Sequence, residues 1–453
     1  MSVCFLILYL LASFVFPAEM FPKLAPYHLP YWIGIGGLAV SVFLVVARRG
    51  EPLRSIQVHV LFAFFAVLIF SWVAAARSWE VLPEAITQFA PSLAMFVLAV
   101  SSVDSLRKFK LVTGLVVFSA LVVLAQGFAA YHFGINEKKF LLDPARREEN
   151  SQEAEISEQV STGDPDSPDE SADENEVGDK RIRGLGMFHD PNDLALSFVT
   201  ALPLVSIRIR RPRIPRYLLE FLLSAALCYG VYLTHSRGGA LGLMFVLLCI
   251  LARRVGWLRA ALVVGILAIG ALAVDIGGGR DFSIQEESAA DRIDAWSEGL
   301  RMLKARPLIG VGYRQFTEHH PMTAHNSFVL CFAESGLVGY FLWLSLLGVS
   351  LLQLQILKQL PNSASSEPDI GGCASILQTA LIGFMVAAFF LSRTYVPVLY
   401  LLIGLSAALV LLAKKKNVPV MWPKPLKMAS LIAAWELSSI VLIYAIGRFQ
   451  SGA

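Results

Sequence analysis

Residues 57–76 read QVHVLFAFFAVLIFSWVAAA, a run of twenty residues that contains no Asp, Glu, Lys or Arg. A helix of this length rises about 30 Å, which matches the thickness of the hydrocarbon part of a lipid bilayer. Because a backbone exposed to lipid must satisfy its own hydrogen bonds, only helices and closed barrels span membranes. The stretch therefore predicts a membrane-spanning helix.

Twelve further apolar stretches repeat this pattern along the 453 residues, near 2–16, 30–47, 84–101, 110–132, 190–207, 216–234, 237–252, 257–275, 326–352, 373–391, 395–413 and 428–446. Charged residues make up only 16% of the chain, whereas a soluble protein carries about a quarter. We therefore expect an all-α, polytopic integral membrane protein with about 12–13 transmembrane helices. The first stretch lacks the basic region and the cleavage site of a signal peptide, so we expect it to be retained as a span.

Positive charge is distributed unevenly between the two ends of these predicted spans. With the N-terminus in the cytoplasm, the cytoplasmic loops and nearby residues hold 20 Lys and Arg, and the short loops and tail on the other side hold five, Lys23, Arg77, Arg237, Arg393 and Arg448. Cytoplasmic loops of membrane proteins are enriched in Lys and Arg. The distribution predicts a cytoplasmic N-terminus and places the long loops 133–189 and 276–325 on the outer face.

The two long outer loops differ in character. Residues 148–179 hold thirteen Asp and Glu and no Lys or Arg, with almost no aliphatic residues, which predicts a disordered insert. The second loop predicts a short amphipathic helix, because Ile293, Trp296, Leu300 and Leu303 form one apolar stripe. Pro307 and the glycines that follow it are expected to end this helix.

These features divide the chain into five segments. We expect an N-terminal transmembrane bundle at residues 1–132, followed by an outer loop with the acidic insert at 133–189. A group of transmembrane helices at 190–275, a partly helical outer loop at 276–325 and a C-terminal transmembrane bundle at 326–453 complete the expected order.

The polar residues that are candidates for a functional site form four groups, all on the predicted outer face. Two of these groups lie where apolar spans begin. In LTHSRGGAL (233–241), Ser236 is expected to cap a helix, and Gly238 and Gly239 to expose backbone N–H groups beside Arg237. An arginine at a helix N-terminus suits a phosphate or diphosphate. The alternative is an arginine that reaches the lipid headgroups.

In FHDPNDLALSF (188–198), the turn before the helix allows two interpretations. Asn192 either belongs to an ordinary helix start or donates to a polar ligand at the membrane surface. The Asp193 carboxylate favours the positive end of the helix.

Two further groups lie in and after the second outer loop. Arg292 precedes Trp296 by four residues and is, taken alone, an ordinary helix-surface charge. In TAHNSFVLCFAESGLVGYFLWL (323–344), Asn326 or Thr323 is expected to cap the long tenth span and leave His325 at its mouth. Next to an arginine-lined anion site, His325 is a candidate general base.

Glu334 lies nine residues after His325, roughly 13 Å deeper along a helix. A carboxylate inside the membrane requires a partner or a polar cavity. Gly336 and Gly339 are expected to allow close approach of helices.

No metal, cofactor or nucleic-acid site is expected. His319 and His320 lie near His325 but without the neighbouring ligands of a zinc site. The five cysteines lie in or at the ends of apolar spans without CxxC spacing, so neither a disulfide framework nor a zinc site is predicted.

The four motif groups, in this order, resemble the O-antigen ligase and O-antigen polymerase superfamily of bacterial envelope glycosyltransferases. The matching stretches lie within about residues 183–345 and read FHDPNDLALSF, THSRGGALG, DRIDAWSEGLRMLKARPLIGVGYRQF and HNSFVLCFAESGLVGY. The acidic insert departs from the family's pattern. Thirteen spans also exceed the family's usual twelve, which leaves open whether both terminal stretches cross the membrane.

This resemblance implies a metal-independent, inverting glycosyltransferase at the outer face of the bacterial inner membrane. Its donor would be a glycan linked to undecaprenyl diphosphate, and its partners would include membrane lipids and a glycan, lipid or protein acceptor. The resemblance implies that Arg237 and Arg292 bind the diphosphate and that His325 deprotonates or orients the acceptor hydroxyl. The further candidate substrate-binding residues are Asn326, Asn192, Ser236, Gly238, Glu334 and Trp296.

The acceptor stays open at this point. A ligase, a polymerase and a protein O-oligosaccharyltransferase share the chemistry and differ in acceptor. A flippase-type transporter is the alternative of a different class, and it predicts charges near the middle of the membrane and broken helices in both halves of the chain. Apart from Glu334 the span centres are apolar, and the polar groups gather on one side, which favours catalysis at the membrane surface.

Overall fold

The structure is a computed structural model that describes residues 2–47, 50–142, 180–208, 214–273, 282–360, 369–416, 418 and 424–451. The acidic insert expected at 148–179 lies outside the described residues.

Each of the thirteen apolar stretches forms a helix, which confirms the predicted fold class. The helices are α1 (Ser2–Phe14), α3 (Leu29–Ala47), α4 (Ile56–Ala76), α5 (Leu82–Ser102), α6 (Leu106–Phe133), α9 (Pro191–Leu204), α10 (Ile214–Leu233), α11 (Arg237–Val255), α12 (Trp257–Ala273), α14 (Ser327–Lys358), α15 (Ile370–Ala388), α16 (Pro397–Lys415) and α17 (Pro425–Ser451). Within the described residues, nine helices are long and apolar enough to cross a membrane. The chain is therefore an all-α, polytopic membrane protein.

Short elements connect these helices. Two short helices lie between spans, α2 (Pro17–Met20) and α7 (Glu137–Phe140). The 3₁₀ turns between spans are η1 (Pro22–Tyr27), η2 (Glu51–Arg54), η3 (Trp79–Val81), η4 (Gly186–Phe188), η5 (Val205–Arg208) and η6 (Phe316–Glu318). The strands β1 (Leu141–Leu142) and β2 (Arg181–Ile182) pair antiparallel, with Leu141 opposite Ile182. The pairing joins a strand that precedes the acidic segment in the sequence to one that follows it.

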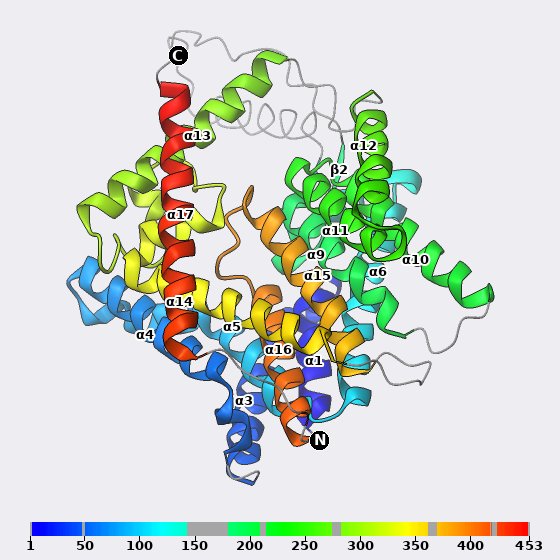
Figure 1. Ribbon diagram of the computed structural model, residues 1–453, viewed down its shortest axis with the longest axis horizontal. Helices are drawn as coiled ribbons and strands as arrows, with labels where there is room; N and C mark the ends of the chain where they lie inside the picture. Colours follow the sequence, from blue (N-terminus) through cyan, green and yellow to red (C-terminus); the bar gives the residue numbers. More distant parts are fainter. Residues whose placement is uncertain are drawn as a thin grey trace, which may run out of the picture.

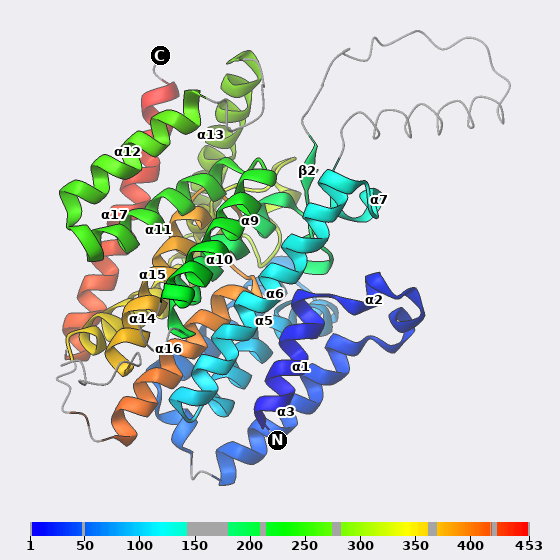
Figure 2. The same ribbon diagram turned by 90° about the vertical axis from the view of Figure 1, so that its right-hand side faces the viewer.

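The expected amphipathic helix of the second outer loop is α13 (Phe282–Ala305). Trp296, Leu300 and Leu303 of its predicted stripe are buried, and Ile293 is half-buried. The helix packs on α14 and α17. Figures 1 and 2 show α13 and β2 at the end of the bundle opposite the N-terminus.

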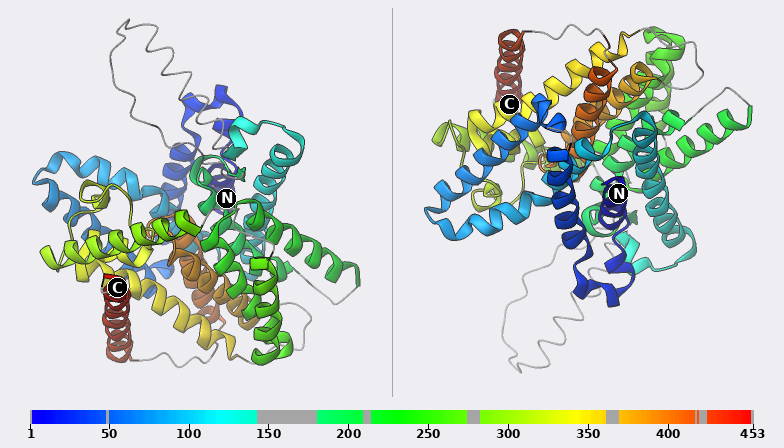
Figure 3. Two further views of the ribbon diagram at one scale, coloured as in Figure 1. Left: turned by 90° about the horizontal axis from the view of Figure 1, so that it is seen from above. Right: turned by 90° about the horizontal axis from the view of Figure 1, so that it is seen from below.

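The bundle is built around α16, whose apolar window is 83% buried, against 17% for α3 and α17. α16 packs on α5, α14 and α15, and α15 packs in turn on α9 and α11. α10 packs on α9, but its first turns project from the bundle in the views from above and below (Figure 3) and expose Tyr217, Leu218, Leu219, Phe221 and Leu222. Such an apolar outer face suits contact with lipid.

The helix α14 is broken in the middle. Gly336 has φ 64° and ψ −170°, a backbone conformation outside the helical range. The chain that leaves α13 enters this break: Leu337 N donates to Pro307 O at 2.8 Å, and Val311 N donates to Ala333 O at 2.9 Å. The break therefore keeps its backbone hydrogen bonds by pairing with residues 307–312.

Two glycines make this pairing possible. A Cβ on Gly336 would lie 2.4 Å from the carbonyl carbon of Leu308, and a Cβ on Gly310 would lie 2.3 Å from that of Glu334. The expectation that Gly336 lets helices approach each other is thus corrected: it admits an extended segment into a helix break. Gly339, by contrast, lies beside Val67 of α4, as an interface between helices requires.

We predict that Gly336→Ala lowers the stability of the folded protein. A left-handed residue other than glycine costs about 1–3 kcal/mol, and the clash with Leu308 adds to this. The measurement is the thermal unfolding midpoint in detergent micelles. The matched control is Gly265→Ala in α12, where a Cβ meets nothing within 4 Å. Equal unfolding midpoints for the two variants would contradict the account of the break.

Candidate active site

The motif groups meet at one end of the bundle, at the starts of α9, α11 and α14 and on α13. The start of α9 is fixed by Asp190, whose carboxylate Oδ1 accepts from Asn192 N at 2.9 Å and from Asn192 Nδ2 at 3.0 Å. Ser236 caps α11 as predicted, since its Oγ accepts from Gly239 N at 3.1 Å. Ser236 Oγ also donates to Asn192 Oδ1 at 2.7 Å, which joins the two helix starts directly.

This packing changes the expected role of the two glycines. The Gly239 N–H is used by Ser236, so it is not open to a ligand. Gly238 is buried, and a Cβ there would lie 3.1 Å from Cβ of Phe390. The glycines bring α11 close to its neighbours, and the Arg237 side chain at the same helix start remains exposed.

Arg237 and Arg292 lie near each other. Burial and the positive charge of Arg237 lower the pKa of the half-buried Arg292. Within the described residues, neither guanidinium has a carboxylate in ion-pair contact. Two like charges close together without a counter-charge favour an anionic ligand.

His325 lies in the loop directly before α14. Its φ is +46°, in the left-handed region where asparagine, aspartate and histidine are the commonest residues besides glycine. Two contacts hold the loop: Trp296 Nε1 donates to Ala324 O at 3.0 Å, and Asn326 Oδ1 accepts from Phe328 N at 2.9 Å as the cap of α14. Trp296 and Asn326 thus position the histidine from either side. The Asn326 Nδ2 atom is buried and has no hydrogen-bond partner among the described residues.

The surroundings of His325 favour its neutral form. Burial lowers the pKa of the imidazole, and the positive charges of Arg292 and Arg393 lower it further, against a smaller opposing effect of Asp190. A neutral imidazole at pH 7 can accept a proton.

Arg393 is the site residue that sequence reasoning missed. Its Nη2 donates to Asp190 Oδ2 at 2.7 Å, and its Nε donates to the carboxylate of Asp193. Its backbone N donates to Ser327 Oγ at 2.7 Å. Asp193, expected to serve the helix N-terminus, therefore forms an ion pair that links α9 to the loop before α16 and to α14. The available signal was an arginine on the side where positive charge is scarce.

Glu334 lies at a polar cavity of about 400 Å³, as its position in a membrane helix requires. Its Oε1 accepts from Phe316 N at 3.2 Å, and its carboxylate also lies beside the Tyr395 hydroxyl. Thr323, Ser392 and Arg393 line the same cavity, which therefore reaches the residues beside His325.

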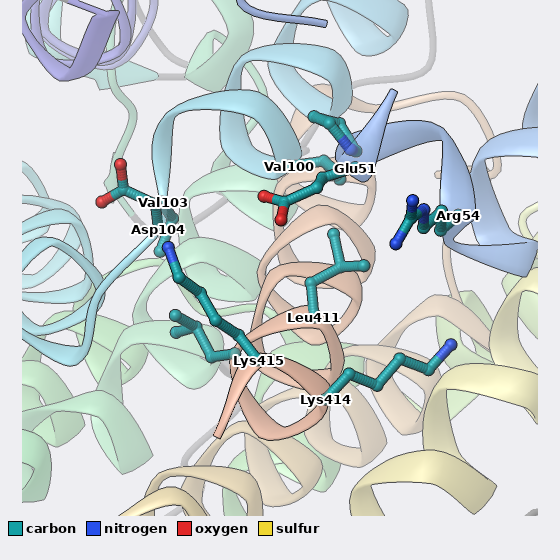
Figure 4. A pocket seen from close by; sticks show the side chains of 10 residues that line it. Glu51, Arg54, Val100, Val103, Asp104, Leu411, Lys414 and Lys415 are labelled. Atoms are coloured by element: carbon teal, nitrogen blue, oxygen red, sulfur yellow. The ribbon is translucent and has the colours of Figure 1, made fainter. Parts of the chain in front are cut away.

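Two other features lie apart from this cluster. Among the described residues no group of three or more His, Cys, Asp and Glu could hold a metal ion; His320 instead pairs with Asp294 at 3.3 Å. A small pocket of about 190 Å³ lies where α5 and α16 end, lined by Glu51, Arg54, Asp104, Lys414 and Lys415 (Figure 4). It is at the opposite end of α16 from the cavity and holds none of the motif residues.

We predict that Arg393 and Asp193 stabilise the fold as a pair. Arg393→Gln leaves two carboxylates without their cation, and we expect a loss of about 1–3 kcal/mol in the free energy of unfolding. Asp193→Asn in the Arg393→Gln background should cost less than it does in the wild type. Unfolding in detergent micelles measures this cycle. Arg301→Gln is the control. Arg301 forms an ion pair with Glu298, but the Arg301 side chain is 65% exposed, so the loss of this pair should change the free energy of unfolding little. Strictly additive effects of the two substitutions would contradict the pairing.

Part of the chain matches a known protein family. Residues 221–344 match the family described as O-antigen ligase. The matched range includes Arg237, Arg292, His325 and Glu334 but neither Asn192 nor Arg393. No curated protein matches the chain. The match supports a function of the O-antigen ligase or polymerase type, with glycosyltransferase-like activity, in a bacterial membrane.

Proposed function

From the match of residues 221–344 to the family described as O-antigen ligase, we propose that the chain transfers a glycan from undecaprenyl diphosphate to an acceptor hydroxyl. The reaction takes place at the outer face of the bacterial inner membrane, the side that the distribution of Lys and Arg assigns to the motif cluster. One observation carries the proposal: two neighbouring arginines, without carboxylate partners among the described residues, lie beside a histidine whose surroundings lower its pKa.

Arg237 and Arg292 bind the diphosphate of the donor. In the transfer, the bond between the anomeric carbon and the diphosphate oxygen breaks, and the electron pair leaves with the diphosphate. Guanidinium groups stabilise the negative charge that develops on this leaving group. Because the sugar arrives already activated on its lipid, the transfer requires neither a nucleotide sugar nor a metal ion.

His325 acts as the general base. The acceptor hydroxyl donates its proton to the neutral imidazole as its oxygen bonds to the anomeric carbon. Attack from the face opposite the diphosphate inverts the anomeric configuration. The low pKa of His325 suits this role, because a protonated imidazole has no lone pair to accept the proton.

We predict that His325→Asn lowers the rate of transfer about 100- to 10,000-fold, the usual contribution of a general base. Asparagine tolerates the left-handed backbone at this position, so the protein should fold normally. The assay uses purified protein, undecaprenyl-diphosphate-linked glycan and candidate acceptors. His319→Asn is the matched control, since His319 is exposed and lies outside the cluster. Normal transfer by His325→Asn would refute the assignment.

We also predict a pH effect of Arg292. The positive charge of Arg292 lowers the pKa of His325, so its removal in Arg292→Gln should raise that pKa. The acid limb of kcat/KM should then move to higher pH, in addition to a loss of about 100-fold in rate from weaker diphosphate stabilisation. Arg301→Gln on the same helix should change neither. An acid limb that stays in place, or moves to lower pH, would show that Arg292 does not act on the base.

A further inference from the structure

The pocket of about 190 Å³ where α5 and α16 end, beside η2 (Figure 4), has no part in the proposed transfer. It lies at the end of the bundle that the distribution of Lys and Arg assigns to the cytoplasm. We propose that this pocket binds the headgroup of a zwitterionic phospholipid with a primary ammonium group, as in phosphatidylethanolamine. The lipid phosphate contacts Arg54, and the ammonium group contacts Glu51. The site is independent of the proposed function, because no residue of the motif cluster lines it.

The fold gives this pocket an apolar floor. α5 and α16 pack on each other, and the last residues of both helices line the pocket. Gly50, with φ 74°, turns the chain from α3 into η2, which packs on α16 and buries Pro52. Val100 and Val103 of the α5 end are also buried. The charged side chains therefore stand around a floor that the packing of three elements holds in place.

The rim of the pocket carries charges of both signs that lack partners. Among the described residues, Arg54 and Lys415 have no carboxylate in ion-pair contact, and Glu51 has no cation in such contact. Asp104, by contrast, pairs with Lys108 at 2.8 Å. In the view of Figure 4, Glu51 lies between Arg54 on one side and Lys415 on the other. A ligand with a phosphate and an ammonium group gives charges of both signs a partner.

The two helix ends favour a ligand without net charge. α5 and α16 both end at the pocket, and the C-terminal end of a helix carries about half a negative elementary charge. These partial charges offset part of the positive charge of Arg54, Lys414 and Lys415. An anionic headgroup would in addition leave Glu51 without a partner and place a like charge beside it. A zwitterion avoids both costs.

An apolar surface beside η2 identifies the ligand as a lipid. α3 packs on η2, and Val42, Phe43 and Val46 in the last turns of α3 are exposed. Leu53 within η2 is exposed as well. Acyl chains that lie along these side chains remove apolar surface from water while the headgroup occupies the pocket. A soluble phosphate compound would make no use of this surface.

The test measures lipid binding to the purified, full-length protein in detergent by native mass spectrometry. Phosphatidylethanolamine, phosphatidylglycerol and phosphatidylcholine with identical acyl chains are titrated separately. We expect phosphatidylethanolamine to bind about threefold to fivefold more tightly than the other two, the range that exposed ion pairs provide. Phosphatidylglycerol lacks the ammonium group, and the methylated ammonium group of phosphatidylcholine cannot donate a hydrogen bond to Glu51.

Two variants separate the two halves of the headgroup. Arg54→Gln should weaken binding of phosphatidylethanolamine about fivefold. Glu51→Gln should weaken it by a similar factor but strengthen binding of phosphatidylglycerol, because a like charge is removed. Both side chains are exposed, so the thermal unfolding midpoint without added lipid should stay unchanged. Arg107→Gln and Glu84→Gln are the matched controls, since both residues are exposed and neither lines the pocket.

Three results would overturn the proposal. Tighter binding of phosphatidylglycerol than of phosphatidylethanolamine would assign the pocket to an anionic lipid. Displacement of the bound lipid by an equal concentration of inorganic phosphate or of phosphoethanolamine would assign it to a soluble compound. Binding that neither Arg54→Gln nor Glu51→Gln changes, or that the control variants change equally, would place the lipid elsewhere on the protein.

Discussion

The pairing of residues 307–312 with the break in α14 is the constraint on which the site depends. A membrane helix cannot leave backbone groups unsatisfied, so the break at Gly336 requires a partner. The segment after α13 supplies it, and Ser71 Oγ adds hydrogen bonds to Ile309 O at 2.6 Å and Glu334 O at 2.7 Å. This connection fixes where α13 ends and where Glu334 meets the cavity. The segment after α13 is thereby fixed in position relative to α14.

The same connection helps to explain how two arginines and a histidine come together. α13 carries Arg292 and, through Trp296, holds the peptide before His325. The start of α14 holds the peptide after His325 through the Asn326 cap. Arg237 reaches the cluster from α11, whose start is bound to Asn192 of α9. Each candidate side chain thus stands beside a capped helix start or on a packed helix, which limits its movement and suits a preorganised site.

The elements of the fold were predictable because length and apolarity decide them. All thirteen stretches are helices, and Ser236 and Asn326 cap helices as their positions indicated. The break at Gly336 was not predictable, because a glycine in an apolar helix also fits close packing of helices. Arg393 was missed for a related reason: its partners Asp190 and Asp193 lie about 200 residues earlier, and periodicity carries no information on such pairs. The prediction that Gly238 and Gly239 expose backbone N–H groups was partly wrong, because the Gly239 N–H donates to the Ser236 side chain.

The central claim is that the donor diphosphate lies between Arg237 and Arg292 with His325 on its acceptor side. The most direct measurement is an electron cryomicroscopy structure of the His325→Asn variant with undecaprenyl-diphosphate-linked glycan bound. The account predicts both guanidinium groups in contact with diphosphate oxygens and the anomeric carbon facing residue 325. A diphosphate inside the Glu334 cavity, or one that touches neither arginine, would contradict it.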